Sequence, residues 1–249
     1  MILALCTQLW LLAQDQAGAA NPQQTVVSVP FIGCRSDGQV GPVEAPEGAI
    51  VSVPISPKAA QELAYYKSAQ GVGVLAPRGW YCFGTYGSNG DTLYVNPEPI
   101  DAKNMFSSGR SKVAGPVIQI SRRYGGTSGR FSVAEIIARV FPAYKPFVTS
   151  VMQDFDQPSS SFPFGPYPTD ALTYRSKTMV EYRTPAQTDG LGTYSWLEKN
   201  GSPIDGVAIL VGQTPDLLLL AVRLPLDLNG FTSDIVGQFE RDATSFPRN

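Results

Sequence analysis

Residues 122–130 have the composition that best suits the binding of an anion. They read Arg-Arg-Tyr-Gly-Gly-Thr-Ser-Gly-Arg, in which glycines let backbone N–H groups approach a ligand while Arg122, Arg123 and Arg130 supply positive charge. The run matches neither the phosphate-binding loop of nucleotide hydrolases nor the dinucleotide-binding fingerprint. The alternative is a glycine-rich loop whose arginines face solvent. These arginines are our first candidate ligand-binding residues.

Two neighbouring aromatic residues, Trp80 and Tyr81, form the second candidate ligand-binding site. They directly precede Cys82 in the sequence. Large aromatic residues beside a disulfide commonly pack in a core, whereas exposed ones would indicate a recognition surface.

The absence of histidine limits the catalytic and metal-binding chemistry that the chain could perform. The chain contains none, which excludes Ser-His-Asp and Cys-His hydrolysis as well as metal sites with histidine ligands. No serine lies three residues before a lysine, so the acylating Ser-x-x-Lys arrangement is excluded too. We expect neither a metal nor a cofactor.

Pairs of carboxylates remain as a route to catalysis, because an acid and a base or nucleophile can flank a glycosidic bond. Their spacing in the sequence does not show which of them share a cleft. The three residues Asp37, Asp91 and Asp101 lack the spacing of a calcium-binding loop. The candidate catalytic carboxylates are Glu98, Asp101, Asp154, Asp156, Glu181, Glu198 and Asp205.

The beginning of the chain predicts export. Residues 2–13 form an apolar run that is too short to span a bilayer, and Ala17-Gly18-Ala19-Ala20 supplies the small residues that signal peptidase accepts. We therefore expect a signal peptide over residues 1–20 and a secreted or periplasmic protein. No Lys or Arg precedes Arg35, and the alternative is a buried first helix.

Cleavage there would remove Cys6 and leave two of the three cysteines, Cys34 and Cys82. A pair of cysteines in an exported chain predicts a disulfide, which would close a loop of about 50 residues and contribute roughly 3 to 4 kcal/mol. Two buried free thiols in a cytosolic protein are the alternative.

Hydrophobic periodicity predicts an α+β fold with a mainly antiparallel sheet, three or four packed helices and long loops rich in Gly and Pro. Residues 217–220 are continuously apolar, which is typical of a central strand covered on both faces. Ser56 is the expected N-cap of the first helix, and Ser132 with Glu135 forms the sequence pattern of a capping box. We expect strands at residues 25–32, with Pro30 at an edge, and at 49–55, 72–75, 81–86, 92–95 and 116–121, then a C-terminal meander of 173–183, 192–198, 206–211 and 217–224, with helices at 59–69, 132–141, 144–155 and 233–244.

A segment rich in proline, serine and aromatic residues, 156–169, is the expected boundary between two regions. An α+β region, 21–155, precedes it and the β-meander with its helix, 170–249, follows, unless both form one continuous domain. The segment either forms a polyproline-like ligand or a lid, or is a fixed surface loop whose aromatic residues pack into the core.

Composition and charge point to a function by elimination. The net charge of -2 arises from 19 basic and 21 acidic residues without a basic block, so we expect no nucleic-acid partner and, after cleavage, no membrane span. The leading hypothesis is a non-catalytic protein of the cell envelope or secreted space, such as an inhibitor or accessory factor, that binds a protein, small molecule or saccharide. The alternative is a carboxylate-dependent hydrolase acting on saccharides.

Overall fold

The computed structural model describes residues 25–107, 112–194 and 196–245. The expected signal peptide, with Cys6, lies outside these residues. In the part of the chain that is described, no helix is long and apolar enough to cross a membrane.

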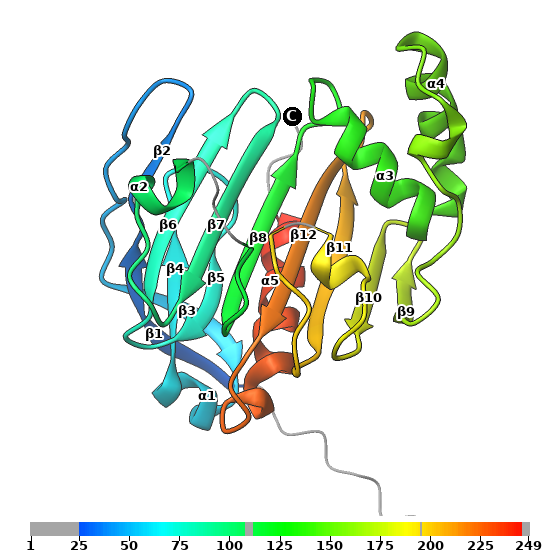
Figure 1. Cartoon of the computed structure of the whole chain (residues 1–249). Helices are drawn as coiled ribbons and strands as arrows, with labels where there is room; N and C mark the ends of the chain where they lie inside the picture. Colours follow the sequence, from blue (N-terminus) through cyan, green and yellow to red (C-terminus); the bar gives the residue numbers. More distant parts are fainter. Residues whose placement is uncertain (1–24, 108–111, 195, 246–249) are drawn as a thin grey trace, which may run out of the picture.

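An eight-stranded sheet forms the centre of the molecule (Figure 1). Its strands are antiparallel except for the pair β2–β6. The expected C-terminal meander is confirmed, because β9 to β12 pair in chain order. The order across the sheet is β2 (Ser36–Gly38), β6 (Tyr81–Gly87), β7 (Gly90–Asn96), β8 (Val117–Arg123), β12 (Asp216–Arg223), β11 (Ile204–Val211), β10 (Met179–Thr184) and β9 (Ala171–Ser176).

A second sheet of four strands has the order β3 (Ile50–Ile55), β1 (Thr25–Gly33), β4 (Leu63–Lys67) and β5 (Val74–Pro77). The strand β1 changes partner along its length. It pairs antiparallel with β3 as far as Pro30, and parallel with β4 from Phe31 onward. Pro30 was expected in an edge strand, and it lies where β1 has β3 on one side only, so a missing N–H is tolerated there.

Three layers result from the alternation of side chains along the large sheet. Leu218 and Leu220 of β12 face a core shared with the small sheet and α5 (Thr232–Ser245). Leu217 and Leu219 face the opposite core, which is covered by α3 (Arg130–Val140) and α4 (Lys145–Asp154). The mixed α+β class and the doubly covered central strand are therefore confirmed.

The first predicted helix is shorter than expected. Ser56 caps α1 (Pro57–Glu62) as predicted, since its Oγ accepts a hydrogen bond of 3.1 Å from the backbone N–H of Ala59. The predicted continuation to residue 69 is wrong, because the chain continues as β4. Tyr65 and Tyr66 of β4 are buried in the core, and this burial outweighs the helix propensity of the segment.

Two other local predictions are wrong. The helix α3 begins after Gly129 without a side-chain cap, so Ser132 and Glu135 lie inside the helix and form no capping box. The carboxylate of Glu135 instead accepts a short hydrogen bond from the hydroxyl of Tyr194.

The predicted strand at residues 192–198 is also absent where the structure describes it, at residues 192–194 and 196–198. It is replaced by the short helix η3 (Leu191–Thr193) and an isolated bridge between Val113 and Leu197. The predicted strand at 173–183 is two strands, β9 and β10, joined by a tight turn.

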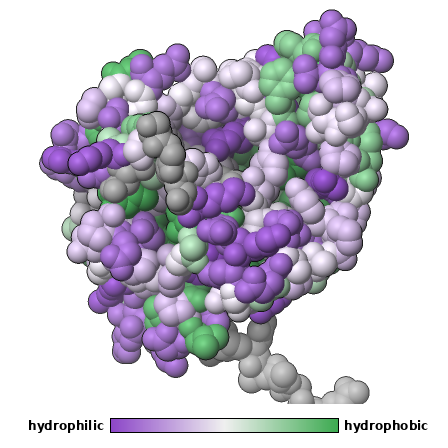
Figure 2. All heavy atoms as spheres, viewed as in Figure 1, coloured by the Kyte–Doolittle hydropathy of each residue, from purple (hydrophilic) through white to green (hydrophobic). Residues whose placement is uncertain are grey.

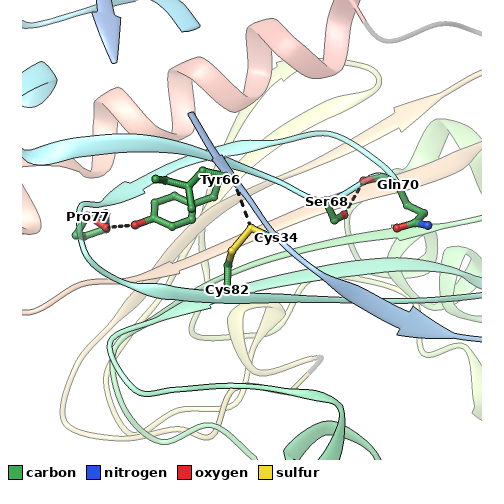
Figure 3. Close-up of a disulfide and its surroundings, with 7 residues drawn as sticks. Cys34, Tyr66, Ser68, Gln70, Pro77 and Cys82 are labelled. Atoms are coloured by element: carbon green, nitrogen blue, oxygen red, sulfur yellow. Dashed lines mark hydrogen bonds between the residues drawn. A yellow bond between two sulfur atoms is a disulfide. The ribbon is translucent and has the colours of Figure 1, made fainter. Parts of the chain in front are cut away.

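The disulfide between Cys34 and Cys82 is confirmed and closes a sequence separation of 48 residues (Figure 3). Cys34 follows β1 of the small sheet, and Cys82 lies on β6 of the large sheet. The bond therefore fastens the two sheets together. Beside it, the hydroxyl of Tyr66 donates a hydrogen bond of 2.8 Å to the carbonyl of Pro77.

The proline-rich segment 156–169 connects α4 to β9. Phe162 packs into the core beneath α3 and α4 and is only 2% exposed, whereas Phe164 remains 47% exposed. Pairing of β8 with β12 brings strands from both sides of this segment into one sheet. The division into two folding units stays a prediction.

Candidate functional site

Arg122, from the predicted anion-binding run, pairs with a carboxylate of the protein itself. Its Nη2 lies 2.8 Å from Oδ2 of Asp216, and Oδ1 of Asp216 accepts a hydrogen bond of 3.0 Å from the backbone N–H of Gly125. Positive charge and a glycine N–H are the two features from which the sequence predicted an anion site. The structure places Asp216 as the anion between them.

The other two arginines of the run bind backbone carbonyls. Nη1 of Arg123 lies 3.3 Å from the carbonyl oxygen of Asp91. Arg130 donates to the carbonyls of Thr127, at 2.6 Å, and Gly126, at 2.8 Å, and its guanidinium lies over the ring of Phe155. These contacts hold the loop, and none of the three cavities that the structure describes is lined by these arginines. Their ligand-binding role stays a prediction.

A buried carboxylate, Asp91, lies beside this loop. The hydroxyl of Tyr124 donates a hydrogen bond of 2.9 Å to its Oδ2. Burial raises the pKa of Asp91, while the bond from Tyr124 and the charges of Arg122 and Arg123 act in the opposite direction. Burial also raises the pKa of Tyr124, to about 12, together with the nearby charge of Asp91. The hydrogen bond joins the beginning of β7 to the residue that follows β8.

The aromatic candidates divide between core and surface. Trp80 packs against the core shared by the two sheets, whereas Tyr81 is half exposed. The two do not form a joint aromatic surface, and no described cavity includes them.

A strip of buried polar side chains follows β7 and β8 on the face that carries α3 and α4. Nη1 of Arg123 lies 3.2 Å from Oγ1 of Thr92, and the Nε2 of Gln119 donates to Oγ of Ser121 at 2.9 Å. Figure 2 shows hydrophilic atoms in a hollow near the upper ends of these strands. These hydrogen bonds offset part of the cost of burying the polar groups.

A groove on the opposite face of the large sheet is the strongest candidate site. It lies beside α5, over the part of the sheet near β9 and β10 that the helix leaves uncovered (Figure 1). The polar contacts of α5 with the small sheet fix its position. Asp242 accepts a hydrogen bond of 2.9 Å from the hydroxyl of Tyr65, and Arg241 donates one of 3.0 Å to the carbonyl of Pro54. We call this feature the α5 groove.

The larger part of the α5 groove is a cavity of about 900 Å³, here named the apolar cavity. The side chains of Met179, Ile209 and Val211 line it from β10 and β11, and Ala243 lines it from α5. Met179 and Ile209 are directly paired across β10 and β11, so they lie on the same face. Alternating side chains of adjacent strands thus form an apolar floor.

The smaller part, of about 540 Å³, is here named the charged cavity. Arg175 of β9 lines both cavities. Its Nε and Nη2 bind the two carboxylate oxygens of Glu181 at 2.6 Å and 2.9 Å. Nη1 of Arg183 lies 2.8 Å and 2.9 Å from the two carboxylate oxygens of Asp205. Two ion pairs, of which that of Arg175 is bidentate, therefore leave this end of the groove polar but nearly neutral.

A third carboxyl group, that of Glu240 on α5, reaches the same cavity and hydrogen-bonds to Glu181. Burial is the main cause that raises the pKa of Glu240 to about 7, and the negative charge of Glu181 adds to the effect. Arg175 and Arg241 oppose it. Glu240 therefore keeps its proton to a higher pH than an exposed glutamate does.

This carboxyl pair does not have the geometry of a glycosidase. Retaining enzymes separate their carboxyl groups by about 5 Å and inverting enzymes by about 6.5 to 9.5 Å, to admit a sugar carbon or a water molecule. Glu181 and Glu240 are joined directly, and both oxygens of Glu181 are occupied by Arg175. Tyr182 is the aromatic residue that lines the charged cavity, and its hydroxyl is bonded to the carbonyl of Leu220.

Sequence reasoning named Glu181 and Asp205 among the carboxylates that could share a cleft, and both line the charged cavity. It missed Glu240 and Arg175. Glu240 follows Phe239, which points into the core, so its position on the groove side of α5 could have been found by placing α5 on a helical wheel. No pattern in the sequence predicts that α5 lies next to β10.

Comparison with known proteins found no family model, no curated protein and no solved structure that matches this chain. The function must therefore be argued from the geometry of the α5 groove.

Proposed function

We propose that this chain is a non-catalytic binding protein that takes an amphipathic ligand in the α5 groove. The observation that carries the proposal is the apolar cavity of about 900 Å³ beside a polar end. Ligand sites in proteins have volumes of about 300 to 1,000 Å³ and combine apolar walls with a few polar groups.

The chemistry of the lining favours a neutral or anionic head group on the ligand. Met179, Ile209 and Val211 would contact its apolar part. The pair with Glu181 uses Nε and Nη2 of Arg175, so Nη1 remains for a hydrogen bond to an acidic or carbonyl oxygen. Binding without chemistry is favoured because the described part of the groove holds no activated nucleophile.

The proposed location is the secreted or periplasmic space, where the protein would act as an inhibitor or accessory factor. The Cys34–Cys82 disulfide supports this, since such bonds persist in oxidising compartments. Intact mass of the exported protein tests it. We expect a mass that lacks residues 1–19 or 1–20, with both cysteines protected from alkylation until reduction. A full-length mass with free thiols would refute export.

Ligand binding can be tested with anilinonaphthalene sulfonate, a fluorescent probe with an apolar ring system and an anionic group. We expect saturable binding at one site in the folded protein. Thr244 is exposed at the rim of the apolar cavity, and Thr244→Trp would fill the cavity from that side. This variant should weaken probe binding by about tenfold or more, the loss that corresponds to about 1.4 kcal/mol.

The matched control is Thr149→Trp, which introduces the same side chain on α4, away from the groove. Its binding should equal that of the unmodified protein. Equal binding by all three proteins, or a signal that does not saturate, would overturn the proposal.

The alternative of a saccharide hydrolase is favoured by one observation, the pKa of Glu240 near 7, which suits a general acid or base. Turnover of aryl glycosides that is lost in Glu240→Gln would support the hydrolase and contradict a purely binding role. We expect no turnover by either protein.

A further inference from the structure

We propose that β9 is a docking edge, to which an extended and acidic segment of a protein partner adds as a further strand of the large sheet. The inference rests on the proposed binding function, because one side-chain pocket for the partner is the apolar cavity of the α5 groove. It identifies a protein surface and the kind of partner that fits it.

The backbone of β9 is open on one side. The strand ends the order of the large sheet and pairs with β10 alone. Among the described residues, none outside β10 forms a backbone hydrogen bond with residues 171–176. Unpaired N–H and C=O groups along a six-residue strand are a template for another strand.

Nothing in the described part of the strand protects this edge. All its residues except Leu172 are exposed, and it contains no proline. Its charged side chain, Arg175, is held against Glu181 on the same sheet. Tyr174 is 54% exposed and offers a ring for contact with an added strand.

Cavities lie on both faces of the sheet at the end of β9. The apolar cavity lies on the α5 face, and a second cavity of about 440 Å³ lies between β9 and the end of α3, lined by Val140, Pro142 and Tyr174. Ser176 lines both of them. Successive side chains of a strand point to opposite faces, so a paired segment would direct alternate side chains into the two cavities. Recognition by strand addition uses this combination of backbone bonds and side-chain pockets.

The charges near this edge are positive, which selects an acidic partner. Lys177 follows β9 and lines the second cavity, and among the described residues it has no ion pair. Lys145 and Arg139 lie over the rings of Phe164 and Tyr167 nearby.

Of the acidic groups near β9, Glu181 is paired with Arg175, and Asp170 accepts hydrogen bonds from the neutral donors of Thr184 and Leu191. In a chain of net charge -2, this positive edge is a local exception. Acidic side chains on the partner would be attracted to it.

The same charges disfavour a second copy of this chain as the occupant. Two β9 strands paired across a two-fold axis would bring Arg175 and Lys177 of both copies to one interface. Repulsion between like charges at an interface is costly.

The probe for the test is a ten-residue peptide with blocked ends in which valine and aspartate alternate. We expect it to bind the full chain at low ionic strength, measured by fluorescence anisotropy. Hydrogen exchange of the β9 amides should slow at least tenfold in its presence. The same peptide with N-methyl groups on every residue keeps its charge but has no backbone N–H to donate along either edge, and it should not bind.

Two charge variants sharpen the test. Lys177→Glu should weaken binding of the acidic peptide at least tenfold and improve binding of the corresponding valine–lysine peptide. The control is Lys103→Glu on α2 (Ala102–Phe106), on the other half of the large sheet, which should leave binding unchanged.

The proposal is overturned if the acidic peptide does not bind, if the N-methylated peptide binds equally well, or if exchange of β9 is unaffected. Dimerisation of the free chain with protected β9 amides would also overturn it, in favour of a second copy. Binding of anilinonaphthalene sulfonate in the α5 groove is measured separately, so loss of peptide binding alone refutes the docking edge and leaves the groove proposal standing.

Discussion

Arg122 of β8 and Asp216 of β12 form an ion pair of 2.8 Å in which both side chains are largely shielded, with exposed fractions of 14% and 20%. Removing Asp216 takes away the counter-charge that binds Arg122 at this partly buried position. We expect Asp216→Ala to lower the free energy of unfolding by about 3 kcal/mol, measured by urea denaturation. The control Asp189→Ala breaks a pair with Lys199 that is exposed, and it should cost at most about 0.5 kcal/mol.

The same variant tests whether residues 122–130 can bind an anion once the internal carboxylate is removed. Inorganic phosphate should restore part of the stability of Asp216→Ala, because it could take the place of the carboxylate that Arg122 and the N–H of Gly125 bind in the unmodified protein. Equal stabilisation of the unmodified protein by phosphate would contradict this.

Glu240 should make stability depend on pH. Its pKa is raised from 4.5 to about 7 on folding, mainly by burial. Both states bind the proton at low pH, and the unfolded chain releases it first as the pH rises. Stability therefore falls between about pH 4.5 and 7 and is constant above, by an amount on the order of 1 kcal/mol, because the group is only partly buried and solvent screens it.

Glu240→Gln should remove this dependence, since the amide stays neutral and can still donate a hydrogen bond to Glu181. Thermal unfolding at a series of pH values measures the effect. The control is Glu98→Gln at an exposed position, which should retain the slope. A slope that persists in Glu240→Gln would assign it to another group.

Arg223 holds two loops against the large sheet. It is 2% exposed, and its guanidinium donates hydrogen bonds to the carbonyls of Val113, Ala114 and Gly115 and to that of Glu198. Burial lowers the pKa of this guanidinium.

We expect Arg223→Met to destabilise the protein by about 3 kcal/mol, because buried carbonyls would lose their donors. Urea denaturation measures the loss, and hydrogen exchange at residues 113–115 shows where it acts. Arg35→Met, at a side chain that is 72% exposed, should change stability little. A loss of similar size in both variants would show that the four carbonyl contacts are not the cause.

Replacing both cysteines of the disulfide, as Cys34→Ala with Cys82→Ala, should lower the free energy of unfolding by about 4 kcal/mol for a separation of 48 residues. Reductant should destabilise the unmodified protein by a similar amount and leave the double variant unchanged. A reductant effect that persists in the double variant would point to a different origin.

The features that were predictable from sequence are those with a local cause. Period-2 alternation indicated β1, and the continuous apolar run indicated β12 as a strand covered on both faces. The strand β4 could not be predicted, because Leu63–Lys67 follows good helix formers and becomes a strand through pairing with β1 on one side and β5 on the other.

The candidate site was harder to predict from the sequence for the same reason. The sequence identified the positive run at 122–130 but not its anion, Asp216, which lies 94 residues further along the chain. The α5 groove joins Arg175 of β9, Glu181 of β10 and Glu240 of α5. These residues come together because of how α5 packs against the sheet, and that packing cannot be predicted from residue types and their spacing.

The pairing of β8 with β12 has a consequence for the order in which the protein is made. β8 ends at Arg123, yet its second partner begins at Asp216. Synthesis starts at the N-terminus, so β8, which lies at the centre of the finished sheet, is made before β12. One edge of β8 therefore stays unpaired while the meander is synthesised. Contacts between residues so far apart form slowly. We therefore expect the incomplete chain to be prone to aggregation until β12 is available, and to depend on chaperones during this interval.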